Sequence, residues 1–268
     1  MCIVCEYKYE EKNLEGLKEL NISNCKDITA IPNIEGLQEL YCRDCTSLTS
    51  IPNIVGLQKL SCWGCTSLTS IPVIAGLKEL SCSNCINITS VPAIAGLQRL
   101  SCWGCMAIKN IPNIIGLKEL CCSNCTSLEN ISHIVGLKIL NCWSCTRLTV
   151  IPNIIGLQML NCWSCANLTV IPDIVGIKDI DCHNCMSLTS IPNIAGLDCR
   201  NCSWIEHHNP KYNSNIKKLV RIQVFTQKWM WLKRLRKYLN TSEFNDWYYS
   251  IEGPGGKNAV RRIEKILN

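Results

Sequence analysis

The sequence lacks any apolar run that approaches the roughly 18 residues needed for a membrane-spanning helix. The opening segment, Met1–Glu6, is also too short to form the apolar core of a signal peptide. We therefore expect an intracellular protein without a membrane partner, in the cytoplasm by default and with the nucleus as the alternative. In a reducing compartment, the 22 cysteines are expected to be free thiols and not a disulfide framework.

Charged residues are scarce, at 18% of the chain, and they are unevenly placed. Residues 203–268 hold 13 Lys+Arg against 5 Asp+Glu, whereas residues 1–202 hold 14 against 16. The net charge of +6 therefore belongs to the C-terminal segment. With 47% hydrophobic residues, the rest of the chain has enough apolar material for a sizeable core.

Signatures of catalysis are missing too. No segment matches the phosphate-binding pattern GxxxxGK[ST], of which Gly255–Lys257 keeps only a fragment. No cysteine lies in residues 203–268, and the segment is too short for a catalytic-cysteine domain. We expect the protein not to be an enzyme and to need no cofactor.

A 20-residue repeat dominates the sequence, with the pattern LxxLxCxxCxxLxxIPxIxG. Nine units keep an unbroken register from Leu17 to Gly196; they begin at Leu17, Leu37, Leu57, Leu77, Leu97, Leu117, Leu137, Leu157 and Ile177. The pattern resembles the leucine-rich repeat in its cysteine-containing form.

Alternation within each unit predicts a short strand. In the unit that begins at Leu57, Leu60 and Cys62 should point inward while their neighbours point outward. Leu68, Ile71 and Ile74 should fill the interior from the return side. Proline in almost every return segment, as at Pro52, Pro72 and Pro112, argues against a regular helix there. We expect a repeat solenoid of the α/β-type, a leucine-rich-repeat horseshoe with a parallel concave β-sheet and an extended or 3₁₀ convex side.

The ends of the array differ from its middle, as stacked repeats require protected ends. Residues 1–16 are expected to form a degenerate capping repeat in which polar residues replace core positions. Residues 17–196 form the nine repeats. Residues 197–210 are a truncated unit and linker, because Cys199 and Cys202 keep the CxxC spacing after a loss of three residues. Residues 211–268 are expected to be a basic, helical C-terminal segment.

Paired cysteines such as Cys42, Cys45, Cys62 and Cys65 match a zinc-site spacing. The match is a by-product of the period, and Ile22 occupies the first cysteine position in the first unit, so that position is apolar. Stacked thiols about 4.8 Å apart do not converge on a tetrahedral centre. We expect no metal site, with a metal or a redox pair as the less favoured alternatives. The leucine-rich-repeat resemblance implies that the second cysteine hydrogen-bonds to the backbone in a ladder along the stack.

The outward position after the first cysteine varies most between units. It holds Ser23, Arg43, Trp63, Ser83, Trp103, Ser123, Trp143, Trp163 and His183. We expect the tryptophans to form an exposed aromatic stripe that binds a partner; the alternative is that duplication copied them and their rings pack on one another. Small residues beside each tryptophan, such as Gly64 and Gly104, would let the indole lie flat. The predicted protein-binding residues are Tyr41, Arg43, Trp63, Trp103, Trp143, Trp163 and His183.

A second outward line carries charges of both signs, at Glu39, Lys59, Glu79, Arg99, Glu119 and Asp179. Because no uniformly basic groove is present, a protein is the expected partner and nucleic acid is not. The basic residues Lys233, Arg234, Arg236 and Lys237 offer a weaker nucleic-acid or nuclear-localisation patch, although a solvated helix face is the ordinary interpretation. Cys121 lies at an outward position and is interpreted as either an exposed thiol or a neutral substitution. We take a monomer as the default.

Together, the cysteine-rich repeats and a tail containing Phe244–Tyr249 and Gly255–Lys257 resemble the repeat proteins of giant DNA viruses of amoebae. The resemblance implies a non-enzymatic scaffold that binds a host protein through its concave face. Some proteins of this sort carry an F-box and select substrates for ubiquitin ligases. That role is the alternative hypothesis, although the chain leaves no room for an N-terminal F-box.

Overall fold

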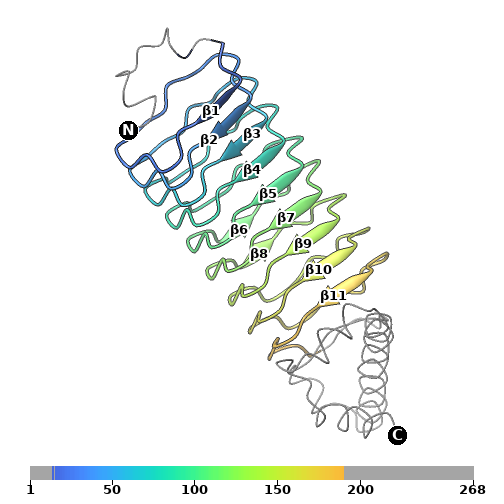
Figure 1. Ribbon diagram of the computed structural model, residues 1–268. Coiled ribbons are helices and arrows are strands. Elements are labelled where there is room, and N and C mark those ends of the chain that lie inside the picture. Colours follow the sequence, from blue (N-terminus) through green and yellow to red (C-terminus); the bar gives the residue numbers. More distant parts are fainter. Residues whose placement is uncertain (1–13, 15, 190–268) are drawn as a thin grey trace, which may run out of the picture. The chain divides into compact units, whose positions relative to one another are not determined.

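The computed structural model describes residue 14 and residues 16–189, which form a parallel β-solenoid with one turn for every 20 residues (Figure 1). Nine strands make one parallel sheet in the order β1-β2-β3-β4-β5-β7-β9-β10-β11. Their bounds are Glu19–Asn21 (β1), Glu39–Tyr41 (β2), Lys59–Ser61 (β3), Glu79–Ser81 (β4), Arg99–Ser101 (β5), Glu119–Cys121 (β7), Ile139–Asn141 (β9), Met159–Asn161 (β10) and Asp179–Asp181 (β11).

Register follows the period without a slip. Leu20 pairs with Leu40, Leu40 with Leu60, and the same offset of 20 holds to the pairing of Leu160 with Ile180. Hydrogen bonds between turns continue past the strands, as from Cys62 N to Ser81 O at 2.8 Å. The predicted parallel sheet is therefore confirmed.

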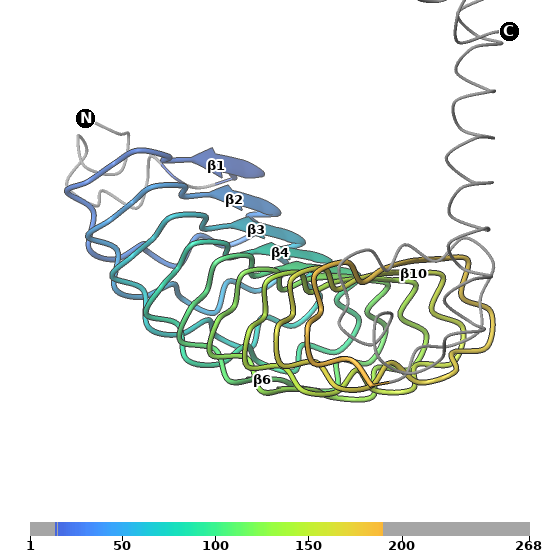
Figure 2. The same ribbon diagram turned by 90° about the horizontal axis from the view of Figure 1, so that it is seen from below.

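The return side of each turn is extended and contains no helix in the described part of the chain. Two short strands, β6 (Asn110–Ile111) and β8 (Asn130–Ile131), pair there, on the side opposite β1 to β4 (Figure 2). Isolated bridges join Ala30 to Ser50 and Val150 to Val170. The extended return predicted from the prolines is confirmed. None of the described residues forms a helix with the length and hydropathy that crossing a bilayer demands.

The interior is built from seven apolar rows that run along the stack. In the third turn they are occupied by Leu57, Leu60, Cys62, Cys65, Leu68, Ile71 and Ile74, none of which is more than 5% exposed. All five inward positions predicted for this turn are confirmed. Ile22, in the first cysteine position of its turn, is 1% exposed, which confirms that this row is apolar.

Each turn bends through one residue with left-handed backbone two positions after the inward cysteine. The φ angles are 54° at Asp44, 73° at Gly64, 56° at Asn84 and 71° at Gly104. Asn, Asp and Gly adopt this conformation most readily. The positive φ is a backbone reason for the glycines beside Trp63 and Trp103, in addition to the effect on the indoles that we expected from the sequence.

Several predictions fall outside the described residues. They are the capping repeat (1–16, of which only residues 14 and 16 are described), the truncated unit (197–210) and the helical segment (211–268) with Lys233, Arg234, Arg236 and Lys237.

Candidate binding groove on the sheet face

The outward positions of the nine-stranded sheet form three parallel rows. The first residue of each strand makes the charged row, which includes Lys59, Glu79, Arg99 and Glu119. The third residue makes the serine row, which comprises Asn21, Tyr41, Ser61, Ser81, Ser101, Cys121, Asn141, Asn161 and Asp181. Two positions further lies the tryptophan row, which runs from Ser23 through Trp63 to His183.

An open groove of about 410 Å³ lies over the charged and serine rows from β2 to β9. Small side chains at Ser61, Ser81 and Ser101 form its floor, together with the backbone of the inward leucines. Larger charged side chains, including Lys59 and Arg99, line one side. The groove exists because four adjacent turns carry Ser or Cys where neighbouring turns carry Tyr or Asn.

Ion pairs link successive members of the charged row. Lys59 Nζ lies 3.3 Å from Glu39 Oε1. Arg99 joins both neighbours, with Nη1 2.9 Å from Glu79 Oε1 and Nε 3.4 Å from Glu119 Oε2. These side chains are about one third to more than one half exposed, so the pairs contribute little stability. Together they form a wall of alternating sign along the charged row.

Tyr41 closes the groove at its β2 end. Its hydroxyl donates to Glu39 Oε2, and this hydrogen bond raises the pKa of Tyr41 above its ordinary value of 10. The same bond, aided by Lys59, lowers the pKa of Glu39. The Arg43 guanidinium lies 5.7 Å from the centre of the Tyr41 ring and donates from Nε to Ser61 Oγ at 2.9 Å. Tyr41 and Arg43 are thus fixed by contacts to their own and the next turn.

The structure separates the predicted residues into two groups. Tyr41 and Arg43 line the groove, whereas Trp63, Trp103, Trp143, Trp163 and His183 do not. In the tryptophan row, Trp63 is 37% exposed and the other three indoles are partly buried. Between them Ser83 is 5% exposed and Ser123 is fully buried, although both occupy outward positions. We attribute this burial to the large indoles on either side of each serine.

Aromatic rings stack at the C-terminal end of this row, as the packing alternative predicted. Trp143 and Trp163 have ring centres 4.9 Å apart with an interplanar angle of 7°. Trp163 and His183 follow at 5.3 Å and 3°. Both faces of Trp163 are therefore occupied by neighbours within the chain, so its flat surface is not available to a partner.

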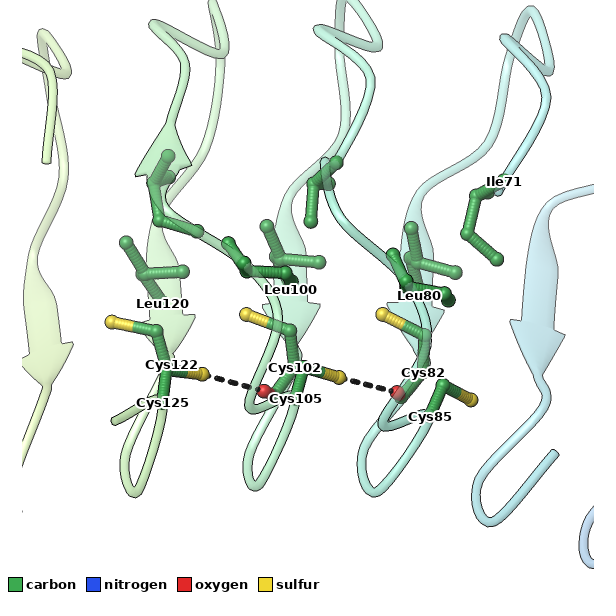
Figure 3. Close-up of a cluster of buried hydrophobic side chains, with 14 of the residues drawn as sticks. Ile71, Leu80, Cys82, Cys85, Leu100, Cys102, Cys105, Leu120, Cys122 and Cys125 are labelled. Atoms are coloured by element: carbon green, nitrogen blue, oxygen red, sulfur yellow. Dashed lines mark hydrogen bonds between the residues drawn. The ribbon is translucent and has the colours of Figure 1, made fainter. Parts of the chain in front are cut away.

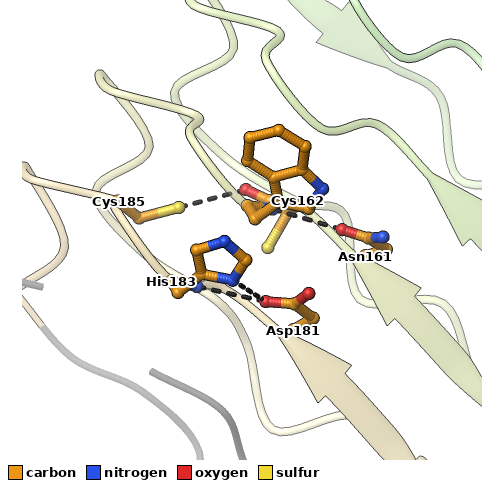
Figure 4. A network of polar contacts seen from close by, with 6 residues as sticks. Asn161, Cys162, Asp181, His183 and Cys185 are labelled. Carbon is orange, nitrogen blue, oxygen red and sulfur yellow. Dashed lines mark hydrogen bonds and ion pairs between the residues drawn. The ribbon is translucent and has the colours of Figure 1, made fainter. Parts of the chain in front are cut away.

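Side chains of the serine row hold this stack in place. Asp181 Oδ1 accepts from the backbone N–H of His183 at 3.4 Å and also contacts the His183 ring nitrogen Nδ1 (Figure 4). Asn161 Oδ1 accepts from the Trp163 N–H at 3.4 Å in the same way. An Asn or Asp two positions before Trp163 or His183 thus fixes the local backbone conformation from which that ring projects.

The second cysteine of each turn forms the predicted ladder, which is confirmed in eight described turns. Cys105 Sγ donates to Cys82 O at 3.0 Å, and Cys125 Sγ donates to Cys102 O at 3.1 Å (Figure 3). Each donor thiol thus bonds to the turn before its own, 23 positions back along the chain. Equivalent bonds run from Cys45, Cys65, Cys85, Cys145, Cys165 and Cys185.

Ionisation is disfavoured for the first cysteines of the turns, whereas hydrogen bonds with those cysteines lower the pKa of the ladder thiols Cys85, Cys125 and Cys165. The hydrogen bond with Cys85 and complete burial raise the pKa of Cys62 well above its ordinary value. The same causes raise the pKa of Cys102, whose partner is Cys125. Within residues 14 and 16–189, no three His, Cys, Asp or Glu side chains are arranged to hold a metal ion. No disulfide bond is found among the described cysteines, all of which are buried except the half-buried Cys121.

Sequence reasoning identified the charged row but not the groove. Ser61, Ser81 and Ser101 drew no attention because serine is ordinary on a surface. The signal was available, since the alternation that placed the tryptophans also places these serines on the same face.

No family model and no curated protein matches this chain.

Proposed function

We propose that the protein is a non-enzymatic scaffold that binds a protein partner in the groove of the sheet face. The observation that carries the proposal is the contrast between core and surface. The inward rows hold nearly the same residues in every turn, whereas the groove changes from Tyr41 and Arg43 through Ser81 to Asn141. A rigid hydrogen-bonded sheet that presents varied side chains in an open groove is suited to recognition of an extended polypeptide.

We also propose that the turns are leucine-rich repeats of the cysteine-containing type, and that the partner is a protein of the host cell. The cysteine ladder and the parallel sheet support this assignment. Recognition through the sheet face is the use that such a fold favours.

Crosslinking mass spectrometry in cells tests the proposal. Ser81→Arg should fill the groove floor and abolish at least the dominant crosslinked partner. Ser90→Arg is the matched control, because Ser90 is exposed on the return side. Equal partner recovery from both variants would contradict binding in the groove.

A second comparison separates the groove from the tryptophan row. Trp63→Ala with Trp103→Ala should reduce crosslinking less than Ser81→Arg, because neither indole lines the groove. Recovery of ubiquitin-ligase adaptors among the partners would favour the substrate-recognition alternative over a simple scaffold.

A further inference from the structure

Four aliphatic side chains project from one edge of the solenoid in consecutive turns. Ile115, Val135, Ile155 and Val175 are 72%, 69%, 70% and 76% exposed. We call these four residues the edge stripe. They belong to no core row, and the sequence pattern gave no reason to single them out.

Backbone geometry explains why these side chains project. Each precedes a glycine with positive φ, between 82° at Gly156 and 98° at Gly116. The glycine reverses the chain tightly, which leaves the preceding side chain at the apex of the turn. Hydrogen bonds join turns at this edge at two places, from Gly96 N to Ile115 O at 2.8 Å and from Gly156 N to Val175 O at 3.2 Å. At about 4.8 Å per turn, the four side chains form one continuous ridge about 15 Å long.

Lysines flank the edge stripe. Lys138 Nζ donates to Gly156 O at 3.2 Å, which places the ammonium group beside Ile155. Lys118 takes the equivalent place in the turn before, close to Gly136. The Lys118 Nζ lies 3.5 Å from the position that a Cβ atom on Gly136 would occupy. Two positions before the stripe residues the chain carries the exposed residues Asn113, His133, Asn153 and Asp173, of which Asp173 alone is acidic.

We propose that the edge stripe docks on the surface of an anionic lipid bilayer. The aliphatic ridge enters the boundary between headgroups and acyl chains, and the lysines bind the phosphate and carboxylate headgroups. Two properties favour a bilayer over a protein partner. The ridge protrudes and is not a groove, and its members are interchangeable Val and Ile, which offer no individual polar contact for a specific partner.

Docking of this kind needs no membrane-spanning segment, but it departs from the expectation that the protein has no membrane partner. It is also independent of the groove, because the edge stripe and the groove share no residue. A bilayer-docked solenoid would keep its sheet face available to a protein.

Vesicle co-sedimentation of the full chain tests the proposal. Vesicles of phosphatidylcholine with about one third phosphatidylserine should retain the protein, whereas pure phosphatidylcholine vesicles should not. Val135→Ser with Ile155→Ser should weaken retention at least about tenfold, because apolar burial is lost. Val73→Ser with Ile86→Ser is the matched control, since these exposed aliphatics lie outside the edge stripe and should leave retention unchanged.

Three outcomes would overturn the proposal. The first is that the wild-type chain fails to bind anionic vesicles. The second is that the edge-stripe variant binds as well as wild type, which would assign retention to other cations, such as those of residues 203–268. The third is that the edge-stripe substitutions abolish self-association in sedimentation velocity while vesicle binding is unchanged, which would identify a second copy as the occupant. Circular dichroism of each variant verifies that the fold is kept, and Ser81→Arg should not alter vesicle binding.

Discussion

Cys85 Sγ donates a hydrogen bond to the carbonyl oxygen of Cys62 at 3.0 Å. That carbonyl also accepts from the backbone N–H of Cys65 at 3.3 Å. One buried oxygen of the inward cysteine therefore serves both its own turn and the next. The two cysteines of the repeat have different roles, because the first fills the core and presents this carbonyl while the second links turn to turn.

Removal of one ladder thiol should destabilise the solenoid. Cys105→Ala leaves Cys82 O without its sulfur donor and opens a small cavity, so we expect a loss of about 1–3 kcal/mol of unfolding free energy. Cys105→Ser keeps a donor and should cost less. Urea unfolding followed by circular dichroism measures both, and equal stability of Cys105→Ala and wild type would refute the ladder's contribution.

Thiol accessibility should follow the same geometry. Among the described cysteines, Cys121 should react first with iodoacetamide, whereas Cys62 and Cys102 should react only after unfolding, because both are fully buried with raised pKa values. Peptide mass spectrometry of labelled native and urea-treated protein checks the order. Labelling of Cys62 ahead of Cys121 in the native protein would contradict it.

Substitutions at the left-handed turn position should act in opposite directions. Ser144 has φ 55°, so Ser144→Gly should raise stability by about 0.5–1 kcal/mol through relief of backbone strain. Gly104→Ala should lower it by at least about 1 kcal/mol, because φ is 71° and the new Cβ would lie 2.2 Å from Asn84 Oδ1. Thermal unfolding of the two variants gives the sign of each effect.

Loss of a stacked indole should cost more than loss of an exposed one. Trp163 stacks on Trp143 and His183, so Trp163→Ala should destabilise by about 3 kcal/mol or more. Trp63 is more exposed, and its row neighbours Arg43 and Ser83 are not aromatic. Trp63→Ala should therefore cost less than half as much. Chemical denaturation compares them, and the reverse order would argue against the stack as a structural element.

Ionisation of Tyr41 should occur above pH 10. Its folded pKa is raised by Glu39, so the hydrogen bond contributes fully below the unfolded pKa and is lost as pH rises through the folded value. Because the folded pKa of Glu39 is lowered, the stabilisation from this hydrogen bond is also lost at low pH, as pH falls through the folded pKa of that carboxyl. Absorbance titration near 295 nm, as a difference between wild type and Tyr41→Phe, should isolate this late step. Glu39→Gln should move the step downward, and an unchanged titration would count against the pairing.

The repeat determined which residues face inward. A period of 20 with Leu, Cys and Ile at fixed places left one consistent way to bury the apolar rows, and this placed Leu60, Cys62, Leu68, Ile71 and Ile74 in the core. Alternation also placed the tryptophans and serines outward. Those inferences depend only on which side of the chain a residue occupies, which the sequence pattern specifies.

What only the tertiary structure decided is how outward residues of neighbouring turns combine. Both faces of the Trp163 ring are covered, by Trp143 and by His183. Ser81, an ordinary surface residue in the sequence, lies in the floor of the groove. Likewise, Ile155 lies at the apex of the tight turn at Gly156, where its side chain is exposed beside Lys138. Exposure depends on side chains that lie 20 residues away in sequence but only about 4.8 Å away in space, and a linear pattern does not contain that distance.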